Sequence, residues 1–241
     1  MTTVEQKYKK FRELHTRPGA FVIPNPWNVG TAMMLGSLGF EALSTTSAGL
    51  AFSIGQRDSE GAISRDEILA NARDIVMATD LPVSGDLENG FGASPMACEK
   101  TIEQAMDIGL VGGCIEDTTG DTDNPIYDFD LSVDRMRAAV QACKDKPFLL
   151  TARAENFICG RPDLGDTIAR LQAFSDAGAD VLYAPGLPDL NSIATLVREV
   201  DKPVNVVMGL TGPTWPLDEL ATAGVHGSAL AAPLRGPRWA P

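Results

Sequence analysis

Eight short apolar segments recur along this chain, and the residues that precede them are of two alternating kinds. An Asp-x-Pro triplet precedes the third, fifth and seventh segments, whereas a glycine precedes the second, fourth, sixth and eighth. The triplets are Asp80-Leu81-Pro82, Asp145-Lys146-Pro147 and Asp201-Lys202-Pro203, and the glycines are Gly39, Gly109, Gly178 and Gly224. Short, almost continuously apolar segments are typical of parallel strands covered on both faces. Alternating entry signals indicate alternating environments, as in a barrel whose inner layers come from odd and even strands in turn.

Stretches with helical spacing separate these segments. Ser64 and Glu67 form a capping box that opens a helix ending near residue 79, and Gly39 is a good C-cap for the helix before it. The predicted strands, each with the loop residues that follow it, are 21–28, 41–49, 81–92, 111–120, 148–157, 181–187, 204–209 and 225–232. The predicted helices are 1–17, 29–38, 64–79, 96–108, 133–144, 166–177, 191–200 and 217–223.

This order predicts an α/β fold, a (β/α)8 TIM barrel that occupies residues 1–241 as one domain and begins with the N-terminal helix at 1–17. The alternative is a doubly wound sheet, and its dinucleotide-binding form is weakened because no G-x-G-x-x-G follows the first strand. The tail at 233–241 holds three prolines and a glycine, so it cannot form a helix. We therefore expect a barrel with a truncated eighth helix and an irregular tail.

The composition restricts the partners of the chain. A net charge of -12 argues against nucleic acid and against anionic membrane surfaces, since both would repel it. The polar start is no signal peptide, and no apolar run has the length of a membrane span. The four cysteines lack metal or redox spacing, which suits a reducing compartment. We expect a cytoplasmic protein.

Two carboxylates follow the third apolar segment, in the stretch LPVSGDLENGFG at 81–92. The i, i+2 spacing of Asp86 and Glu88 places both on one side of an extended backbone. Two acids that point the same way repel each other, so a pocket tolerates them only with a cation between them. The alternative is a solvated acidic loop.

Other polar residues end the remaining strands, and in a barrel these ends share one mouth. In chain order they are Asn25, Asn28, Thr46, Ser47, Ala48, Asp58, Asp86, Glu88, Glu116, Asp117, Arg153, Glu155, Tyr183 and Asn205. Any one of these could instead be a helix N-cap or a surface residue. Taken together, the acids with one arginine predict a metal-centred site.

The motifs at these positions resemble the isocitrate lyase and phosphoenolpyruvate mutase superfamily over nearly the whole chain. The matching stretches are NPWN at 25–28, STTSAG at 44–49, GQRD at 55–58, GDLENGFG at 85–92, GGCIEDTTG at 112–120 and TARAENF at 151–157. GDLENGFG is similar to the family pattern D-x-[DE]-x-G-[FY]-G, and together with the downstream Ile-Glu-Asp it is a specific pair. The resemblance implies a barrel of the phosphoenolpyruvate/pyruvate type.

The resemblance also implies roles for individual residues. Asp86 would bind Mg2+ (or Mn2+) most directly, with Glu88, Glu116 and Asp58 holding its waters. Substrate carboxylate or phosphonate groups would be bound by Thr46, Ser47, Ala48 and Arg153, to which we add Tyr183 and Asn205 as residues at strand ends. The candidate catalytic residues are Arg153, Asp58 and Glu116. Tyr183 could alternatively only fill the barrel.

Two departures from the family pattern narrow the expected activity. The loop at 118–130 has no Cys and no Lys, whereas isocitrate and methylisocitrate lyases carry a Lys/Arg-Cys-Gly motif there. Those two activities are therefore not expected, and the chain looks like the phosphonomutase-like branch. The sixth strand ends in Tyr183, where lyases of the family usually place a Glu and the mutase a His.

The sequence thus predicts a Mg2+-dependent lyase that cleaves a C–C or C–P bond of a small 2-oxo or 2-hydroxy acid through an enolate. One alternative is a phosphonomutase or phosphonopyruvate hydrolase. Another is a non-catalytic paralogue impaired by loss of the eighth helix. A small carboxylate or phosphonate is the expected partner, and a homo-oligomer is the expected assembly, weakened if the eighth helix is missing.

Overall fold

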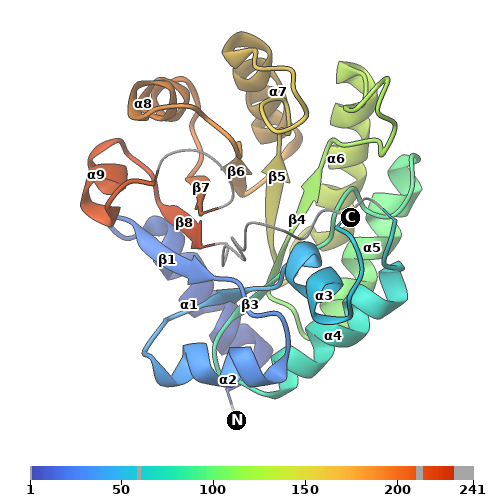
Figure 1. The fold of residues 1–241 in the computed structure, drawn as a ribbon, viewed down its shortest axis with the longest axis vertical. Coiled ribbons are helices and arrows are strands. Elements are labelled where there is room, and N and C mark those ends of the chain that lie inside the picture. The colour runs from blue at the N-terminus through green and yellow to red at the C-terminus, as the bar shows by residue number, and fades with distance from the viewer. Residues whose placement is uncertain (1, 59–60, 210–213, 231–241) are drawn as a thin grey trace.

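Eight parallel strands form one curled sheet, and helices surround it (Figure 1). The computed structural model describes residues 2–58, 61–209 and 214–230. The strands pair in the order β1-β8-β7-β6-β5-β4-β3-β2. Their bounds are β1 Phe21–Pro24, β2 Leu43–Ser44, β3 Val83–Asp86, β4 Gly112–Glu116, β5 Leu149–Arg153, β6 Val181–Tyr183, β7 Val204–Met208 and β8 Gly227–Leu230. The side-chain amide of Asn25 donates to the Ser44 carbonyl oxygen at 3.0 Å, which links the end of β1 to β2.

The helices alternate with these strands along the chain. Their bounds are α1 Val4–Thr16, α2 Val29–Ser37, α3 Ser47–Ser53, α4 Arg65–Met77, α5 Pro95–Asp107, α6 Phe129–Cys143, α7 Leu164–Ala177, α8 Leu190–Glu199 and α9 Leu217–Thr222. The capping box predicted at Ser64 and Glu67 is present. Gly178 ends α7 with φ of 110°, a backbone conformation that glycine adopts without a steric penalty. The predicted (β/α)8 architecture is confirmed.

Strand register places the polar side chains of the barrel in rows. Glu116 pairs with Arg153 and Arg153 with Tyr183, across β4, β5 and β6. Asp86 pairs with Cys114 across β3 and β4, one row below. Since alternate residues of a strand point to the same face, these five side chains share the inner face of the barrel.

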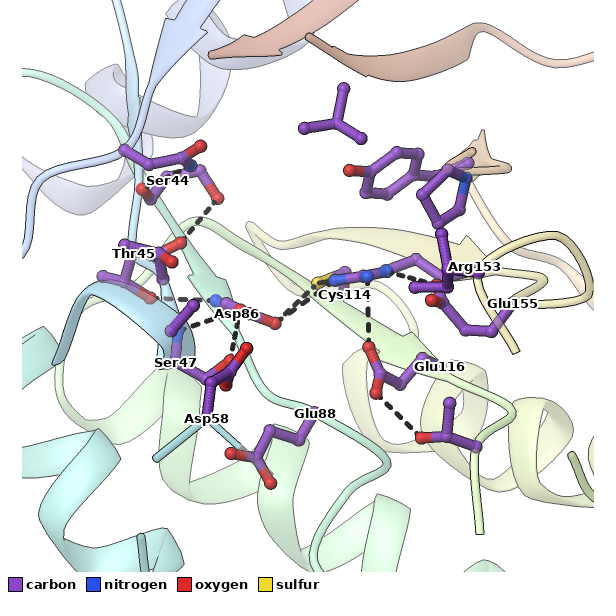
Figure 2. A pocket seen from close by; sticks show the side chains of 18 of the residues that line it. Ser44, Thr45, Ser47, Asp58, Asp86, Glu88, Cys114, Glu116, Arg153 and Glu155 are labelled. Atoms are coloured by element: carbon purple, nitrogen blue, oxygen red, sulfur yellow. Dashed lines mark hydrogen bonds and ion pairs between the residues drawn. The ribbon is translucent and has the colours of Figure 1, made fainter. Parts of the chain in front are cut away.

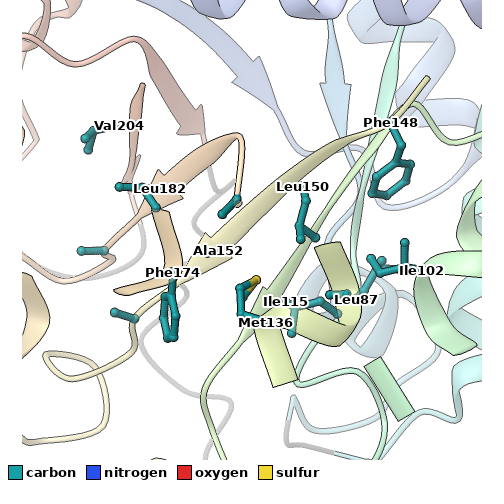
Figure 3. Packing of buried hydrophobic residues seen from close by; sticks show 14 of the residues in the cluster. Leu87, Ile102, Ile115, Met136, Phe148, Leu150, Ala152, Phe174, Leu182 and Val204 are labelled. Atoms are coloured by element: carbon teal, nitrogen blue, oxygen red, sulfur yellow. The ribbon is translucent and has the colours of Figure 1, made fainter. Parts of the chain in front are cut away.

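The opposite faces of the same strands are apolar and pack against the helices. Leu150 and Leu182 from the strands lie with Met136 of α6 and Phe174 of α7 in the largest buried cluster (Figure 3). All four side chains are at most 2% exposed. This alternation, apolar outward and polar inward, fixes which residues reach the interior of the barrel.

Helix α1 closes the base of the barrel, at the amino ends of the strands. Phe11 and Leu14 form a second buried cluster with Phe21 of β1 and Leu149 of β5. A Cβ atom on Gly112 would lie 2.8 Å from the Phe11 ring, so a glycine gives that ring its space. The opposite end of the barrel, at the carboxyl ends of the strands, is open.

Two features differ from the sequence-based expectation. Residues 47–53 form the short helix α3, where we expected the end of a strand and a loop; the Thr46 hydroxyl caps this helix by accepting from the Gly49 N–H. Helix α6 begins at Phe129, four residues before the predicted start. The truncated eighth helix and the tail at 233–241 lie outside the described residues. Within the described part of the chain, no helix has the length and apolar character that a membrane span needs.

Candidate active site

A cavity of about 390 Å³ opens at the carboxyl ends of the strands. Figure 2 shows the hydroxyl side chains of Ser44, Thr45 and Ser47 on one side of Asp86, with Arg153 on the other. The described residues that line the cavity are Asn25, Ser44, Thr45, Thr46, Ser47, Ala48, Asp58, Asp86, Glu88, Cys114, Glu116, Thr118, Arg153, Glu155, Ile158, Cys159, Tyr183, Pro185 and Val207. They come from widely separated parts of the chain, as expected for the mouth of a barrel.

Asp86, the last residue of β3, is held from its neighbours on the β2 side. Its backbone N–H donates to the Thr45 hydroxyl at 2.9 Å. Its Oδ2 atom accepts from both the N–H and the hydroxyl of Ser47, each at 3.0 Å. Because Ser47 is the first residue of α3, this short helix fixes the orientation of the carboxylate.

Arg153, the last residue of β5, lies between three carboxylates. Its Nε donates to Glu155 at 2.8 Å, one Nη lies 3.2 Å from Glu116, and the other lies 3.4 Å from Asp86. The contact with Asp86 is the longest and is shared with the Cys114 thiol, which is 3.8 Å from the same nitrogen. The guanidinium therefore joins the ends of β3, β4 and β5.

Burial and charge act in opposite directions in this cluster. Burial alone would lower the pKa of Arg153, but the charges of Glu155 and Glu116 outweigh it and raise that pKa well above its ordinary value. Burial raises the pKa of Glu116 and of Glu155, although Arg153 opposes the shift. Burial, with Asp86 nearby, raises the pKa of the Cys114 thiol to about 12. Arg153 is thus cationic, and the Cys114 thiol is protonated at neutral pH.

Glu88 and Asp58 complete the acidic lining. Glu88 follows β3 with a left-handed backbone, φ 46°, which is uncommon for a residue with a side chain. Its carboxylate is 6% exposed and accepts from the Gly61 N–H at 3.3 Å. Figure 2 shows both side chains on the same flank of Asp86.

The oxygen donors of the cavity suit a hydrated metal ion. Among the described residues, no group of three or more His, Cys, Asp and Glu side chains is close enough to enclose an ion by direct bonds. The available donors are mainly carboxylate and hydroxyl oxygens, the hard ligands that Mg2+ and Mn2+ prefer. Mg2+ usually keeps several waters and takes only one or two carboxylates from a protein. The residues present therefore fit an ion bound by one carboxylate and hydrated toward the others.

Tyr183 provides an aromatic wall. Its ring lies under Arg153, with the guanidinium carbon 4.7 Å from the ring centre. Burial raises the pKa of its hydroxyl, so the phenol is neutral. A neutral phenol can donate a hydrogen bond to an anion.

The structure brings nearly all of the predicted site residues into one cavity. Those that line it are Asp58, Asp86, Glu88, Glu116, Arg153, Thr46, Ser47, Ala48 and Tyr183. Asn205 lies elsewhere: it is the second residue of β7, near the base of the barrel, and its amide contacts His15 of α1. Val207, two residues further along the same inner face, reaches the cavity instead. We therefore do not carry Asn205 forward as a substrate-binding residue.

Several lining residues were missed by the sequence-based prediction. Glu155 stood among the strand ends but received no role, and Cys114 was not among the candidate site residues. Period-two alternation could have found Cys114, since it is two residues before Glu116 on β4. Ile158 and Cys159 come from the loop after β5 and carried no signal in the sequence.

Comparisons with known proteins identify relatives of the chain in sequence and in fold. A family model described as phosphoenolpyruvate phosphomutase matches residues 11–232. The 2-methylisocitrate lyase of Escherichia coli (strain K12) is 29% identical over 226 residues, which cover 90% of this chain and 75% of the relative.

Two solved structures from Burkholderia cenocepacia J2315 are also similar. A candidate lyase/mutase is 56% identical, with a TM-score of 0.91, over 94% of this chain and 81% of the other. A candidate phosphonomutase is 33% identical, with a TM-score of 0.85, over 94% of this chain and 92% of the other. The family resemblance inferred from the motifs is confirmed.

Proposed function

On the premise that this chain is an enzyme of the phosphoenolpyruvate phosphomutase family, to which it belongs, we propose that it is a Mg2+-dependent lyase. Its substrate is a small 2-oxo or 2-hydroxy acid, and the bond that breaks is a C–C bond next to the carbon that becomes an enolate. Mn2+ can replace Mg2+ because both prefer oxygen ligands.

The observation that carries this proposal is the charge of the cavity. Five carboxylates line it, from Asp58, Asp86, Glu88, Glu116 and Glu155. Among the described lining residues, only one basic side chain, that of Arg153, opposes them. Small 2-oxo and 2-hydroxy acids are anions, and such a cavity would repel them without a further cation. A divalent ion compensates the carboxylates and attracts the substrate.

Each residue then has a defined task. Asp86 would hold the ion directly, and Asp58, Glu88 and Glu116 would accept hydrogen bonds from its waters. The bound ion supplies Lewis-acid stabilisation of the negative charge that develops on the substrate oxygens. Arg153 donates to the substrate carboxylate through the nitrogen whose contact with Asp86 is long, at 3.4 Å. Thr46, Ser47 and Ala48 offer hydroxyl and backbone N–H groups to the same anion.

The loop after β4 decides between reactions within the family. Residues 118–126 return on themselves, with Thr118 paired to Ile126, and contain neither Cys nor Lys. The chain therefore lacks the loop thiol expected of isocitrate and methylisocitrate lyases, and we propose a different substrate from theirs. Phosphonate chemistry is the second candidate, supported by the similarity to the candidate phosphonomutase.

A metal-controlled substrate screen tests the proposal. The purified protein is incubated with a panel of 2-oxo acids, 2-hydroxy acids and phosphonopyruvate, in Mg2+ or in EDTA, and products are followed by proton and phosphorus NMR. We expect turnover of at least one 2-oxo or 2-hydroxy acid in Mg2+ and none in EDTA. Loss of the phosphonate signal would instead support C–P chemistry.

Two further outcomes contradict the proposal. Equal turnover in EDTA would remove the role of the metal. No turnover anywhere on the panel would favour the non-catalytic paralogue. Asp134→Asn is the matched control for acidic site variants, because this carboxylate is exposed, lies outside the cavity and pairs with the exposed Arg137.

We further propose that the enzyme works in the cytoplasm as a homo-oligomer. The spacing of the four cysteines, which fits neither a metal site nor a redox motif, supports a reducing compartment. Apolar side chains exposed on and just after α2 support self-association: Met33, Met34 and Leu38 are each at least 60% exposed. Light scattering in solution tests the assembly, and a monomer at all concentrations would contradict it.

A further inference from the structure

Adjacent acids at the end of β4 point in opposite directions. Glu116 reaches the cavity, whereas Asp117 is 3% exposed and directed toward the helices. Both oxygens of Asp117 are engaged there: Oδ1 accepts from the Glu155 N–H at 2.9 Å, and Oδ2 accepts from Arg170 at 3.0 Å. Asp117 is thus a buried, fully bonded carboxylate outside the cavity.

Arg170 anchors this carboxylate from helix α7. It is 6% exposed, and its Nε donates to Asp166 at 2.8 Å. The nitrogen that binds Asp117 also donates to the Tyr127 carbonyl oxygen at 2.9 Å. Tyr127 in turn donates its N–H to the Asp117 carbonyl oxygen at 2.8 Å. The Asp117–Arg170 pair therefore fastens the ends of β4 and β5, helix α7 and the end of the β4 loop to one another.

The same pair is connected to the cavity through Glu155. The backbone of Glu155 is held by Asp117, and its side chain is fully buried. Oε1 of Glu155 accepts from Arg153 Nε, while Oε2 has no hydrogen-bond partner among the described residues. The position of this carboxylate therefore depends on its backbone and on Arg153, and a shift of the backbone would reorient the guanidinium.

We infer that the Asp117–Arg170 pair is a positioning device that aims the Arg153 guanidinium at the substrate carboxylate. Neither member of the pair lines the cavity, so both act through Glu155. This inference rests on the proposed function, because it assigns the anion-binding role of that function to Arg153. Displacement of the guanidinium weakens its hydrogen bond to a carboxylate, because such a bond depends steeply on distance and angle.

A double-mutant cycle tests the inference, with oxalate as the probe. Oxalate affinity in Mg2+ is measured calorimetrically for the wild type, Asp117→Asn, Arg153→Lys and the double variant. We expect Asp117→Asn to weaken oxalate at least tenfold in the wild-type background and less than twofold when Arg153 is already lysine. Equal losses in both backgrounds would overturn the inference, since Asp117 would then act independently of Arg153.

Controls separate positioning from general stability. Ser175→Ala removes another polar contact of α7, the partly buried 2.6 Å hydrogen bond from Ser175 to Asp201, and should leave oxalate affinity unchanged. If Asp117→Asn does not fold, Arg170→Lys enters the same cycle, with the same dependence on Arg153 expected. An equal loss from Arg170→Lys in both backgrounds would likewise overturn the inference.

A second readout distinguishes failure of the inference from failure of the proposed function. If the wild type does not bind oxalate, the proposed function fails, and positioning is judged from hydrogen exchange of the Arg153 Nε–H by nitrogen-15 NMR. Exchange at least tenfold faster in Asp117→Asn than in the wild type and in Ser175→Ala supports the inference. Unchanged exchange overturns it.

Discussion

The arginine at the end of β5 shows how single residues set the chemistry of this cavity. Arg153 forms ion pairs with Asp86, Glu116 and Glu155, so one positive charge is shared among three carboxylates. One guanidinium cannot neutralise three acids, and burial makes the remaining charge costly. Asp86, which keeps the longest of the three contacts, is the carboxylate most available to a metal ion.

Replacement of Asp86 should therefore abolish metal binding. Asp86→Asn keeps the size of the side chain but removes the charge that the ion needs. We expect at least a hundredfold loss of Mn2+ affinity, measured by electron paramagnetic resonance of the free ion. Asp134→Asn should bind as the wild type does. Unchanged affinity in Asp86→Asn would refute the assignment of Asp86 as the direct ligand.

The hydroxyl of Tyr183 should contribute to substrate binding or turnover and little to stability. Tyr183→Phe keeps the ring under Arg153 and removes only the donor. A hydrogen bond to a charged group is worth about 1.5–3 kcal/mol, so kcat/KM should fall by roughly ten- to a hundredfold. The melting temperature should stay within about 2 °C. A variant with wild-type kcat/KM would show that Tyr183 only fills the barrel.

Helices and strands could be predicted from the sequence where a pattern repeats along the chain, and less well where a pattern occurs once. Strands and long helices were predicted because apolar runs recur eight times along the chain and alternate with stretches of helical spacing. Helix α3 has only seven residues and begins inside a run of hydroxyl residues, so its pattern resembles a loop. Asp86 and Glu116 were predictable because they end buried strands, whereas Asp58 was assigned from the GQRD motif at 55–58.

Asn205 shows a limit of the same reasoning. It was assigned to the mouth as a strand-end residue, but it is the second residue of β7, which continues for three more residues, to Met208. Along a strand, the next side chain on the inner face is two residues further on and lies one layer higher in the barrel. Strand length decides which layer a residue occupies, and an apolar run does not show where pairing begins. The contacts of Asp117 were beyond the sequence for another reason, since they join segments up to 53 residues apart.

The packing of α1 under the barrel depends on the missing side chain of Gly112. A methyl group there would lie 2.8 Å from the Phe11 ring and 3.0 Å from the Leu149 carbonyl oxygen. Gly112→Ala should therefore lower the free energy of unfolding by about 2 kcal/mol, the usual cost of overpacking, in urea denaturation. Gly36→Ala in α2, where the nearest atoms are 3.9 Å away, should be neutral or stabilising. Equal stability of the two variants would contradict this account of the base.

Over the whole molecule, the two ends of the barrel respond to pH in opposite directions. At the mouth, burial raises the pKa of Glu116 and Glu155, so the folded state there binds protons more tightly than the unfolded state. Their contribution to stability is present at low pH and is lost as the pH rises through the folded pKa. At the base, His15 is 2% exposed, and burial lowers its pKa from 6.5 to about 4. The contribution of His15 to stability therefore changes in the opposite direction: it is present at high pH and is lost as the pH falls.

His15 should therefore destabilise the fold as the pH falls. Its Nδ1 lies 3.0 Å from the Phe11 carbonyl oxygen and its Nε2 lies 3.4 Å from the Asn205 amide nitrogen, an arrangement that fits a neutral ring with the proton on Nδ1. Between pH 6.5 and 4 the unfolded chain binds a proton at this residue and the folded chain does not, so acidification favours unfolding. The contribution present above pH 6.5 and lost by pH 4 is about 3 kcal/mol.

Comparison of the wild type with His15→Gln separates the contribution of His15 to stability from that of the carboxylates at the mouth. Urea unfolding of the wild type and of His15→Gln is compared from pH 7 to pH 4, because the glutamine variant lacks the titrating ring and keeps the acids. The wild type should lose stability relative to the variant over this range, by about 3 kcal/mol. An NMR titration of the His15 ring should give a midpoint near pH 4. Parallel stability curves, with His15 titrating near 6.5, would show that the base of the barrel admits water and that α1 does not seal it.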